Sequence, residues 1–162
     1  GHLELRLEDL AHAPNLIVLR SLGKFFGLAG ARVGFAFAAP ELLAQLRERI
    51  GPWALTGPSR FVATAALNDR DWQQQTCARL ARDGARLAAL LAPLGDVRSH
   101  PLFAYVPRAD TVSCADFLAR RGILVRHFDA ALRFGLPGAK AEWQRLDAAL
   151  RELYDSFPLE PL

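Results

Sequence analysis

The chain has 162 residues, of which 51% are hydrophobic and 23% are charged, proportions that are ordinary for a soluble globular protein with a buried core. Its formal net charge is only +3 and its arginines are scattered, which excludes the clustered basic surface typical of a nucleic-acid-binding protein. Because no apolar run could cross a membrane and Cys77 and Cys114 match no metal-ligand spacing, we expect a cytoplasmic protein with buried, reduced thiols.

The first part of the chain alternates apolar runs with stretches rich in glycine and proline. Residues 15–20 (NLIVLR) and 31–38 (ARVGFAFA) each predict a buried strand, and a segment with three glycines separates them. Leucines at helical spacing after Pro40 predict a helix over 41–50. Residues 51–58 contain two prolines and two glycines, so we expect them to be irregular.

The remainder predicts helices that alternate with short strands. Helices are expected over four segments: 59–67, 71–91, 113–121 and 139–157. Strands are expected within three segments: 97–106, 123–127 and 131–135. Ser59 and Asp71 are the expected N-caps of the first two helices, and Gly122 is expected to end the third.

This order of elements predicts an α/β protein with two parts. Residues 1–50 hold apolar strands without the helices needed to cover them, which is typical of a piece of a larger α/β sheet. Residues 51–162 are expected to form a small α+β domain with its connecting helices. In the longest helix the predicted apolar stripe is formed by four residues: Trp72, Leu80, Leu87 and Leu91.

The segment SLGKFFGLAGARVG, residues 21–34, contains the residues best suited to chemistry. Lys24 follows a predicted strand, and open α/β sheets bind ligands at the carboxyl ends of their strands. Apolar neighbours would remove water from its amine and favour the neutral form that reacts with carbonyl groups. Ser21 and Arg32 could bind a phosphate. From spacing alone, a glycine-rich turn with Lys24 and Arg32 merely exposed is an equally good interpretation.

The same segment resembles the cofactor-attachment segment of fold-type I pyridoxal-phosphate (PLP) enzymes of the aminotransferase superfamily, S-x-x-K followed by G-L-x-G-x-R. The resemblance implies that PLP is the cofactor, that Lys24 forms the Schiff base and that Ser21 and Arg32 bind the cofactor phosphate. It implies a homodimer, and it places the end of the large domain in residues 1–50. The aspartate and the stacking aromatic residue of the family precede this segment, so we expect the isolated chain to bind PLP poorly and to be inactive.

Two more segments, GPWALTGP (51–58) and LRFGLPG (132–138), are similar to the L-threonine-O-3-phosphate decarboxylases of cobalamin biosynthesis. This resemblance implies that Arg133 binds the substrate α-carboxylate, that Arg126 binds a nearby acidic group and that Trp53 lines the substrate pocket. The substrate would be a phosphorylated amino acid. Without the resemblance, both arginines could be surface residues at strand ends, and Phe103 and Tyr105 are interpreted as residues of a strand core.

Two alternatives to the decarboxylase stay open at this point. The first is a histidinol-phosphate-type aminotransferase, in which Lys24 would move the α-proton of the substrate. The second is a cofactor-free interaction module that keeps the fold. The sequence favours neither nucleic acid nor a membrane as a partner, and it indicates no resident metal.

Overall fold

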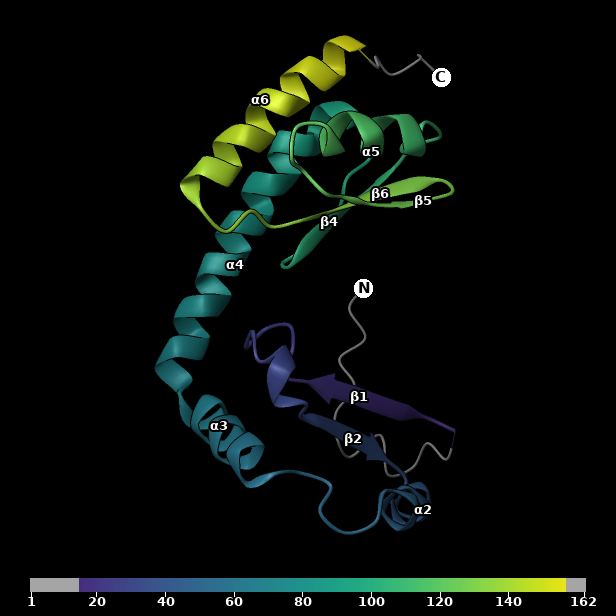
Figure 1. Ribbon diagram of the computed structural model, residues 1–162, viewed down its shortest axis with the longest axis vertical. Helices are drawn as coiled ribbons and strands as arrows, with labels where there is room; N and C mark the ends of the chain where they lie inside the picture. The colour runs from purple at the N-terminus through teal and green to yellow at the C-terminus, as the bar shows by residue number, and fades with distance from the viewer. Residues whose placement is uncertain (1–14, 157–162) are drawn as a thin grey trace. The chain divides into compact units, whose positions relative to one another are not determined.

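A computed structural model describes residues 15–156, and the contacts within it divide the chain into two compact units, residues 1–70 and residues 71–162 (Figure 1). The predicted assignment of residues 1–50 to a larger domain stays a prediction. Among the described residues, no helix has the length and apolar character needed to span a membrane.

The first unit is built on an antiparallel ribbon of two strands, β1 (Ile17–Ser21) and β2 (Gly34–Ala38), which confirms both predicted strands. The connection between them contains the short 3-10 helix η1 (Ala29–Ala31), and the helices α2 (Pro40–Ile50) and α3 (Gly57–Asn68) follow. The prediction for the start of α3 is wrong. Thr56 is the N-cap, because its Oγ1 accepts a hydrogen bond from the backbone N–H of Ser59 at 3.2 Å.

The ribbon is more exposed than the apolar pattern of its strands predicts. Ile17 is 54% exposed and Leu19 is 75% exposed, although both were expected to be buried. Strands that are apolar on both faces are typical of sheets covered on both sides. The apolar sequence of the ribbon therefore suits a sheet that is covered on both faces, whereas residues 15–156 leave part of the ribbon exposed.

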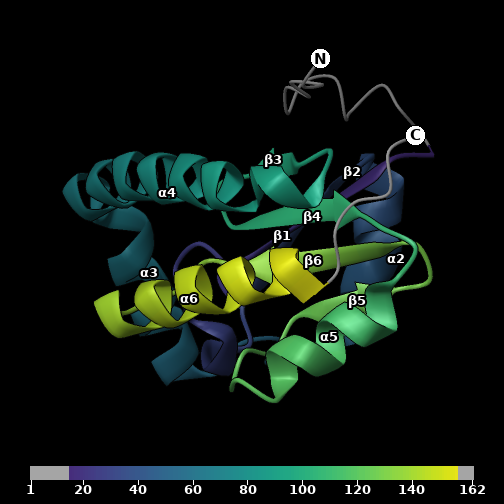
Figure 2. The ribbon, with the colours of Figure 1, turned by 90° about the horizontal axis from the view of Figure 1, so that it is seen from above.

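The second unit is a four-stranded antiparallel sheet with helices on one of its faces, in the strand order β3-β4-β6-β5. Its strands are β3 (Arg98–His100), β4 (Phe103–Pro107), β5 (Arg126–Phe128) and β6 (Ala131–Gly135). Its helical elements are α4 (Arg70–Leu91), η2 (Ala92–Leu94), α5 (Thr111–Ala119) and α6 (Lys140–Ser156). Figures 1 and 2 show α4, α5 and α6 on the same side of this sheet. The predicted alternation of strands and helices is confirmed.

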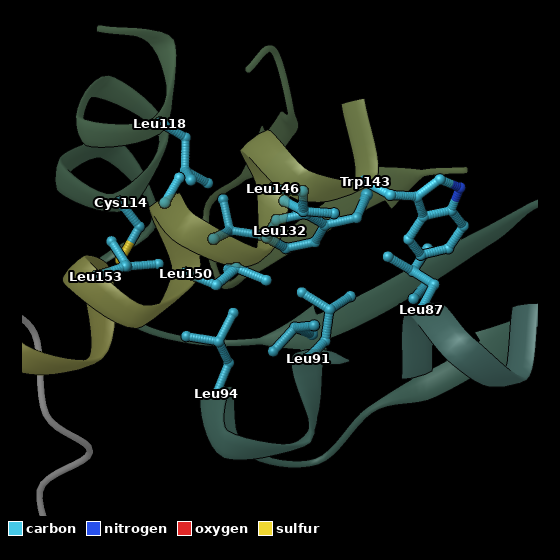
Figure 3. Close-up of a cluster of buried hydrophobic side chains, with 14 residues drawn as sticks. Leu87, Leu91, Leu94, Cys114, Leu118, Leu132, Trp143, Leu146, Leu150 and Leu153 are labelled. Atoms are coloured by element: carbon cyan, nitrogen blue, oxygen red, sulfur yellow. The ribbon is translucent and has the colours of Figure 1, made fainter. Parts of the chain in front are cut away.

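One face of the sheet supplies apolar side chains to the core, among them Ala104, Val106, Leu132 and Phe134, all at most 1% exposed. Figure 3 shows how residues of the helices and of β6 meet in this core: Leu87, Leu91, Leu94, Cys114, Leu118, Leu132, Trp143, Leu146, Leu150 and Leu153. Because side chains alternate along a strand, the other face carries the remaining residues of β4 and β6. We call this second face of the sheet, which α4, α5 and α6 do not cover, the open face.

Several predictions about single residues in this unit are wrong. Phe103 and Tyr105 lie on the open face, because the strand alternation turns Ala104 and Val106 toward the helices instead. Cys114 is buried as predicted, but Cys77 is exposed on α4. Asp71 lies in the first turn of α4 and not at its N-cap, since the helix begins at Arg70.

The apolar stripe predicted for α4 is only partly confirmed. Leu80, Leu87 and Leu91 are buried, at 7%, 0% and 0% exposure, whereas Trp72 is 39% exposed. Of the four residues, Leu87 and Leu91 belong to the main core cluster. The stripe therefore packs against the sheet and α6 through its C-terminal turns.

A largely buried ion pair joins the end of β4 to the start of α5. Arg108 donates two hydrogen bonds of 2.6 Å to the carboxylate of Asp110, and the thiol of Cys114 donates to the same carboxylate at 3.4 Å. The hydrogen bonds from Arg108 hold the pKa of Asp110 below its usual value, against the opposing effect of burial. Because the folded-state pKa is lowered, this stabilisation is present at neutral pH and is lost as the pH falls through the folded-state pKa.

We expect Asp110→Asn to lower the free energy of unfolding at neutral pH by roughly 1–3 kcal/mol, because it removes the charged acceptor from a buried guanidinium. The difference from the unsubstituted chain should shrink as the pH falls below the usual aspartate pKa toward the lowered pKa of folded Asp110. Urea unfolding across this pH range measures both effects. Asp147→Asn is the matched control, because Asp147 pairs with Arg151 on the exposed surface of α6 and should contribute little. A loss of stability that does not change with pH would contradict the account.

Candidate functional site

The three residues predicted to bind a cofactor lie together in the loop between β1 and β2. Ser21 is the last residue of β1, Lys24 lies at a bend three residues later, and Arg32 lies just before β2 begins. All three side chains are exposed within this chain. The structure thus brings them into one loop, which we call the lysine loop (residues 21–33).

The lysine loop is anchored by two buried residues that neighbour these polar side chains. Leu22 is 3% exposed and Val33 is 6% exposed, and both pack with Ala63 of α3. The N–H of Leu22 donates to the carbonyl of Val33 at 3.3 Å, and the N–H of Leu28 donates to the carbonyl of Leu22 at 2.9 Å. These contacts fix both ends of the loop, so Ser21 and Arg32 project from neighbouring points of a closed turn.

Two features of the loop backbone explain its glycine-rich sequence. A Cβ at Gly23 would lie 3.3 Å from the Ser21 hydroxyl oxygen and 3.4 Å from the Cα of Ala29, so only glycine fits there without displacement. Gly27 has a φ of 67°, a left-handed conformation that glycine adopts without strain. The glycine spacing in the sequence indicated such a loop. In the structure, Gly23 allows the backbone to approach Ser21 and Ala29 closely, and Gly27 allows a turn.

Arg32 is itself in a left-handed conformation, with a φ of 54°. For a residue with a side chain this costs on the order of 1–3 kcal/mol, and such strain gathers at functional sites. Its Nη1 donates to the carbonyl of Ala29 at 3.3 Å, which leaves its other N–H groups available for a ligand. The strain is therefore concentrated at a residue that presents hydrogen-bond donors.

The donor set of the loop fits a phosphate group. The Ser21 hydroxyl oxygen accepts from the N–H of Gly23 at 3.0 Å, so its hydrogen remains free to donate. Arg32 adds a guanidinium and Lys24 an amine, and no acidic residue occurs between Ser21 and Gly34 to repel an anion. The residues that line a depression of about 430 Å³ include Arg20, Ser21 and four phenylalanines, Phe25, Phe26, Phe35 and Phe37. Such aromatic surface suits a flat ring bound through its phosphate.

The predicted removal of water from the Lys24 amine is not provided by the described residues, because the side chain is exposed. Its neighbour Phe26 packs against the Leu22 cluster, and the rings of Phe25 and Phe26 meet edge to face with their centroids 4.9 Å apart. The aromatic neighbours therefore pack with the loop and do not enclose the amine. Any shielding of Lys24 from water has to come from a ligand or from residues outside 15–156.

A second group of predicted residues lies on the open face of the sheet. Arg126 of β5 and Arg133 of β6 are directly opposite each other in the strand register, and Arg133 is likewise opposite Tyr105 of β4. Residues opposite each other on antiparallel strands project from the same face, so these three side chains form one row, the arginine row. Like charges in this position repel, and within residues 15–156 neither Arg126 nor Arg133 has an ion pair.

Aromatic rings accompany both arginines of the row. The guanidinium carbon of Arg133 lies 5.4 Å from the centroid of the Phe103 ring, and that of Arg126 lies 5.0 Å from the centroid of Phe128. The Tyr105 and Phe128 ring centroids are 6.1 Å apart. The sequence analysis did not predict these contacts between arginines and aromatic rings, because it assigned Phe103 and Tyr105 to the core. The small residue Ala104 between them is the feature that could have indicated the correct orientation, because the face of β4 that carries Ala104 packs against the helices.

Trp53, the third residue predicted to contact substrate, belongs to neither the lysine loop nor the arginine row. It is 93% exposed in the connection between α2 and α3, and its φ of 66° is left-handed. It is not among the residues that pack with Leu22 and Val33 or that line the depression next to Ser21. Its place in a substrate pocket stays a prediction.

The family model for class I and II aminotransferases matches residues 2–149 of the chain. The chain is 49% identical to a threonine-phosphate decarboxylase of Pseudomonas aeruginosa, over 89% of this chain and 45% of that protein. It is 38% identical to a threonine-phosphate decarboxylase of Sinorhizobium sp, over 93% of this chain and 47% of that protein. The chain therefore spans about half the length of the curated relatives it matches.

The fold resembles that of a crystal structure of histidinol-phosphate aminotransferase from Sinorhizobium meliloti in complex with pyridoxal-5'-phosphate. The TM-score is 0.77 at 27% sequence identity, and the match covers 93% of this chain and 44% of that one.

Proposed function

Because this chain belongs to the class I and II aminotransferase family, whose members are PLP-dependent enzymes, we propose that the protein decarboxylates L-threonine O-3-phosphate to aminopropanol phosphate, as part of cobalamin biosynthesis. The predicted family, the α/β fold class and PLP as the cofactor are confirmed at the level of this family. The specific reaction, the substrate and the roles of single residues are our proposal.

The observation that carries the choice of substrate is the pair of arginines on the open face. Arg126 and Arg133 stand opposite each other without a carboxylate partner in the described part of the chain, and an anionic ligand would relieve their repulsion. L-Threonine O-3-phosphate carries a carboxylate and a phosphate on adjacent carbons, so one small molecule could engage both guanidinium groups. The identity of 49% with a threonine-phosphate decarboxylase supports the same choice.

The proposed mechanism assigns a separate task to each group of residues. Lys24 would hold PLP covalently, and Ser21 and Arg32 would bind its phosphate through the donors that the loop presents. When bound, PLP accepts the electrons of the substrate bond that breaks. Arg133 would hold the α-carboxylate and Arg126 the phosphate, which orients the substrate for loss of CO2. The Lys24 amine, once displaced by the substrate amine, would then donate a proton to the α-carbon.

The alternative is a histidinol-phosphate-type aminotransferase, which the fold match to the Sinorhizobium meliloti enzyme favours. Histidinol phosphate has a phosphate but no carboxylate, so only one anionic group would meet the arginine row. Lys24 would then move the α-proton of the substrate instead of protonating a carbon that has lost CO2. Analysis of the products formed from each of the two substrates separates the two reactions.

We further propose that the protein acts as a cytoplasmic homodimer. A cofactor-free interaction module, the remaining alternative, predicts that the full-length protein does not bind PLP. Absorbance of the purified full-length protein in the range of protein-bound PLP would rule that alternative out.

The role proposed for Arg32 makes a specific prediction about cofactor affinity. We expect Arg32→Ala to weaken PLP binding by the full-length protein about 10- to 100-fold, the equivalent of one or two charge-assisted hydrogen bonds. Because alanine would remain strained at a φ of 54°, Arg32→Gly serves as a second variant that removes the guanidinium and relieves the strain. A PLP titration followed by absorbance measures both variants.

The matched control for this titration is Arg47→Ala, which removes an exposed arginine from α2. It should bind PLP as the unsubstituted protein does. If Arg32→Gly retained the full cofactor affinity, the guanidinium of Arg32 would not be a phosphate ligand.

A further inference from the structure

The arginines of the open face differ from other arginines of the same unit in what orients them. Arg108 is bound by the carboxylate of Asp110, and Arg121 donates two hydrogen bonds to Glu152, at 2.7 and 2.9 Å, while it also lies 3.4 Å from the Phe117 ring centroid. These carboxylates neutralise the arginines that they orient. Arg126 and Arg133 instead lie over aromatic rings and have no carboxylate partner within residues 15–156.

An aromatic ring orients a guanidinium without consuming its charge or its hydrogen-bond donors. The face of the ring attracts the cation, whereas the N–H groups at the edge of the guanidinium remain free for a ligand. A carboxylate in the same place would compete directly with an anionic substrate. The choice of rings therefore suits arginines that have to bind an anion and release it again.

Both rings are held by a further aromatic side chain on the same face. The Phe103 ring stacks on His100 with centroids 4.7 Å apart and an interplanar angle of 22°. His100 is fixed in turn, because its Nδ1 accepts the backbone N–H of Leu102 at 3.2 Å. Phe128 is neighboured by Tyr105, with centroids 6.1 Å apart. The open face thus has an aromatic layer beneath its cationic groups.

We propose that Phe103 and Phe128 are positioning residues that hold Arg133 and Arg126 in place against their mutual repulsion and so set the protein's affinity for a doubly anionic substrate. This inference rests on the proposed function for the identity of the substrate. The positioning itself does not depend on which anion binds. It predicts that loss of either ring disorders one specific arginine and weakens binding of the anionic group that this arginine contacts.

The test uses Phe103→Leu and Phe128→Leu in the full-length protein. We expect each variant to raise the KM for L-threonine O-3-phosphate about 3- to 10-fold, with kcat changed less than about 2-fold, because the rings orient a binding group and do not touch the reacting bond. Phe103→Tyr keeps a ring and should retain the KM of the unsubstituted protein. Phe117→Leu is the matched control, since it removes a ring from beneath Arg121 and should leave the KM unchanged.

A second measurement does not require turnover. Nitrogen-15 relaxation of the arginine Nε–Hε groups reports how ordered each guanidinium is in the same variants. We expect Phe103→Leu to disorder Arg133 alone and Phe128→Leu to disorder Arg126 alone. Unchanged order of both arginines would overturn the inference, whatever the kinetics show. If the order falls as expected but the unsubstituted protein neither binds nor converts L-threonine O-3-phosphate, the proposed function fails while the positioning role stands.

Discussion

Replacing Lys24 with alanine is expected to reduce turnover by the full-length protein by a factor on the order of 10³ or more, because one amine would supply both covalent attachment and proton transfer. The lysine loop contains no second lysine that could substitute for it. The only other lysine of the chain is Lys140, which begins α6 in the other unit. The loss should therefore be close to complete.

Two measurements on this variant separate attachment from catalysis. Reduction of the PLP-loaded protein with borohydride, followed by mass spectrometry, should show a covalently bound cofactor in the unsubstituted protein and none in Lys24→Ala. Lys140→Ala is the matched control and should behave as the unsubstituted protein in both assays. Covalent cofactor retained by Lys24→Ala would show that the attachment site lies elsewhere.

Removing Arg133 is expected to have the second largest effect, a decrease in kcat/KM of about 10²- to 10³-fold for L-threonine O-3-phosphate. The expected loss is large because Arg133→Ala removes a charged partner of the carboxylate and leaves that group without its hydrogen bonds. Arg133→Lys should recover only part of it, since an ammonium lacks the planar fork that binds both carboxylate oxygens. Steady-state kinetics of both variants measure these effects.

The control for Arg133 is provided by the same sheet. Arg98 of β3 lies opposite Tyr105, at the far end of the row that contains Arg133, and it already pairs with Asp96 at 3.4 Å. Arg98→Ala should change kcat/KM less than about 2-fold, because surface ion pairs contribute little. If the Arg98 and Arg133 variants lost activity equally, the positive charge of the face would act only through general attraction of the substrate.

The order of elements could be predicted from the sequence because local signals agree with the tertiary structure. The alternation of apolar residues located β6 at its observed bounds, and Pro40 marked the first turn of α2. Capping was harder to predict, because both Thr56 and Ser59 are good cap residues and they bond to each other, with a hydroxyl–hydroxyl distance of 2.8 Å. Choosing between them requires the path of the backbone.

The open face illustrates a second limit of sequence interpretation. Phe103 and Tyr105 are large and apolar, so composition favours the core, yet the core is filled on that side by Ala104 and Val106. Strand register decides which set is buried, and register depends on pairing with β6, which lies 24 or more residues away in the sequence. The same pairing places Arg126 and Arg133 opposite each other, a relation that their spacing alone did not establish.

The most direct test of the proposed function is a product analysis with the full-length, PLP-loaded protein and L-threonine O-3-phosphate in the absence of any 2-oxo acid. Release of CO2 and appearance of aminopropanol phosphate in equal amounts, followed by phosphorus NMR and by trapping of the CO2, is the result that we expect. The same protein should leave histidinol phosphate unchanged when 2-oxoglutarate is supplied. Conversion of histidinol phosphate that depends on 2-oxoglutarate, with no CO2 released from L-threonine O-3-phosphate, would contradict the account and identify an aminotransferase.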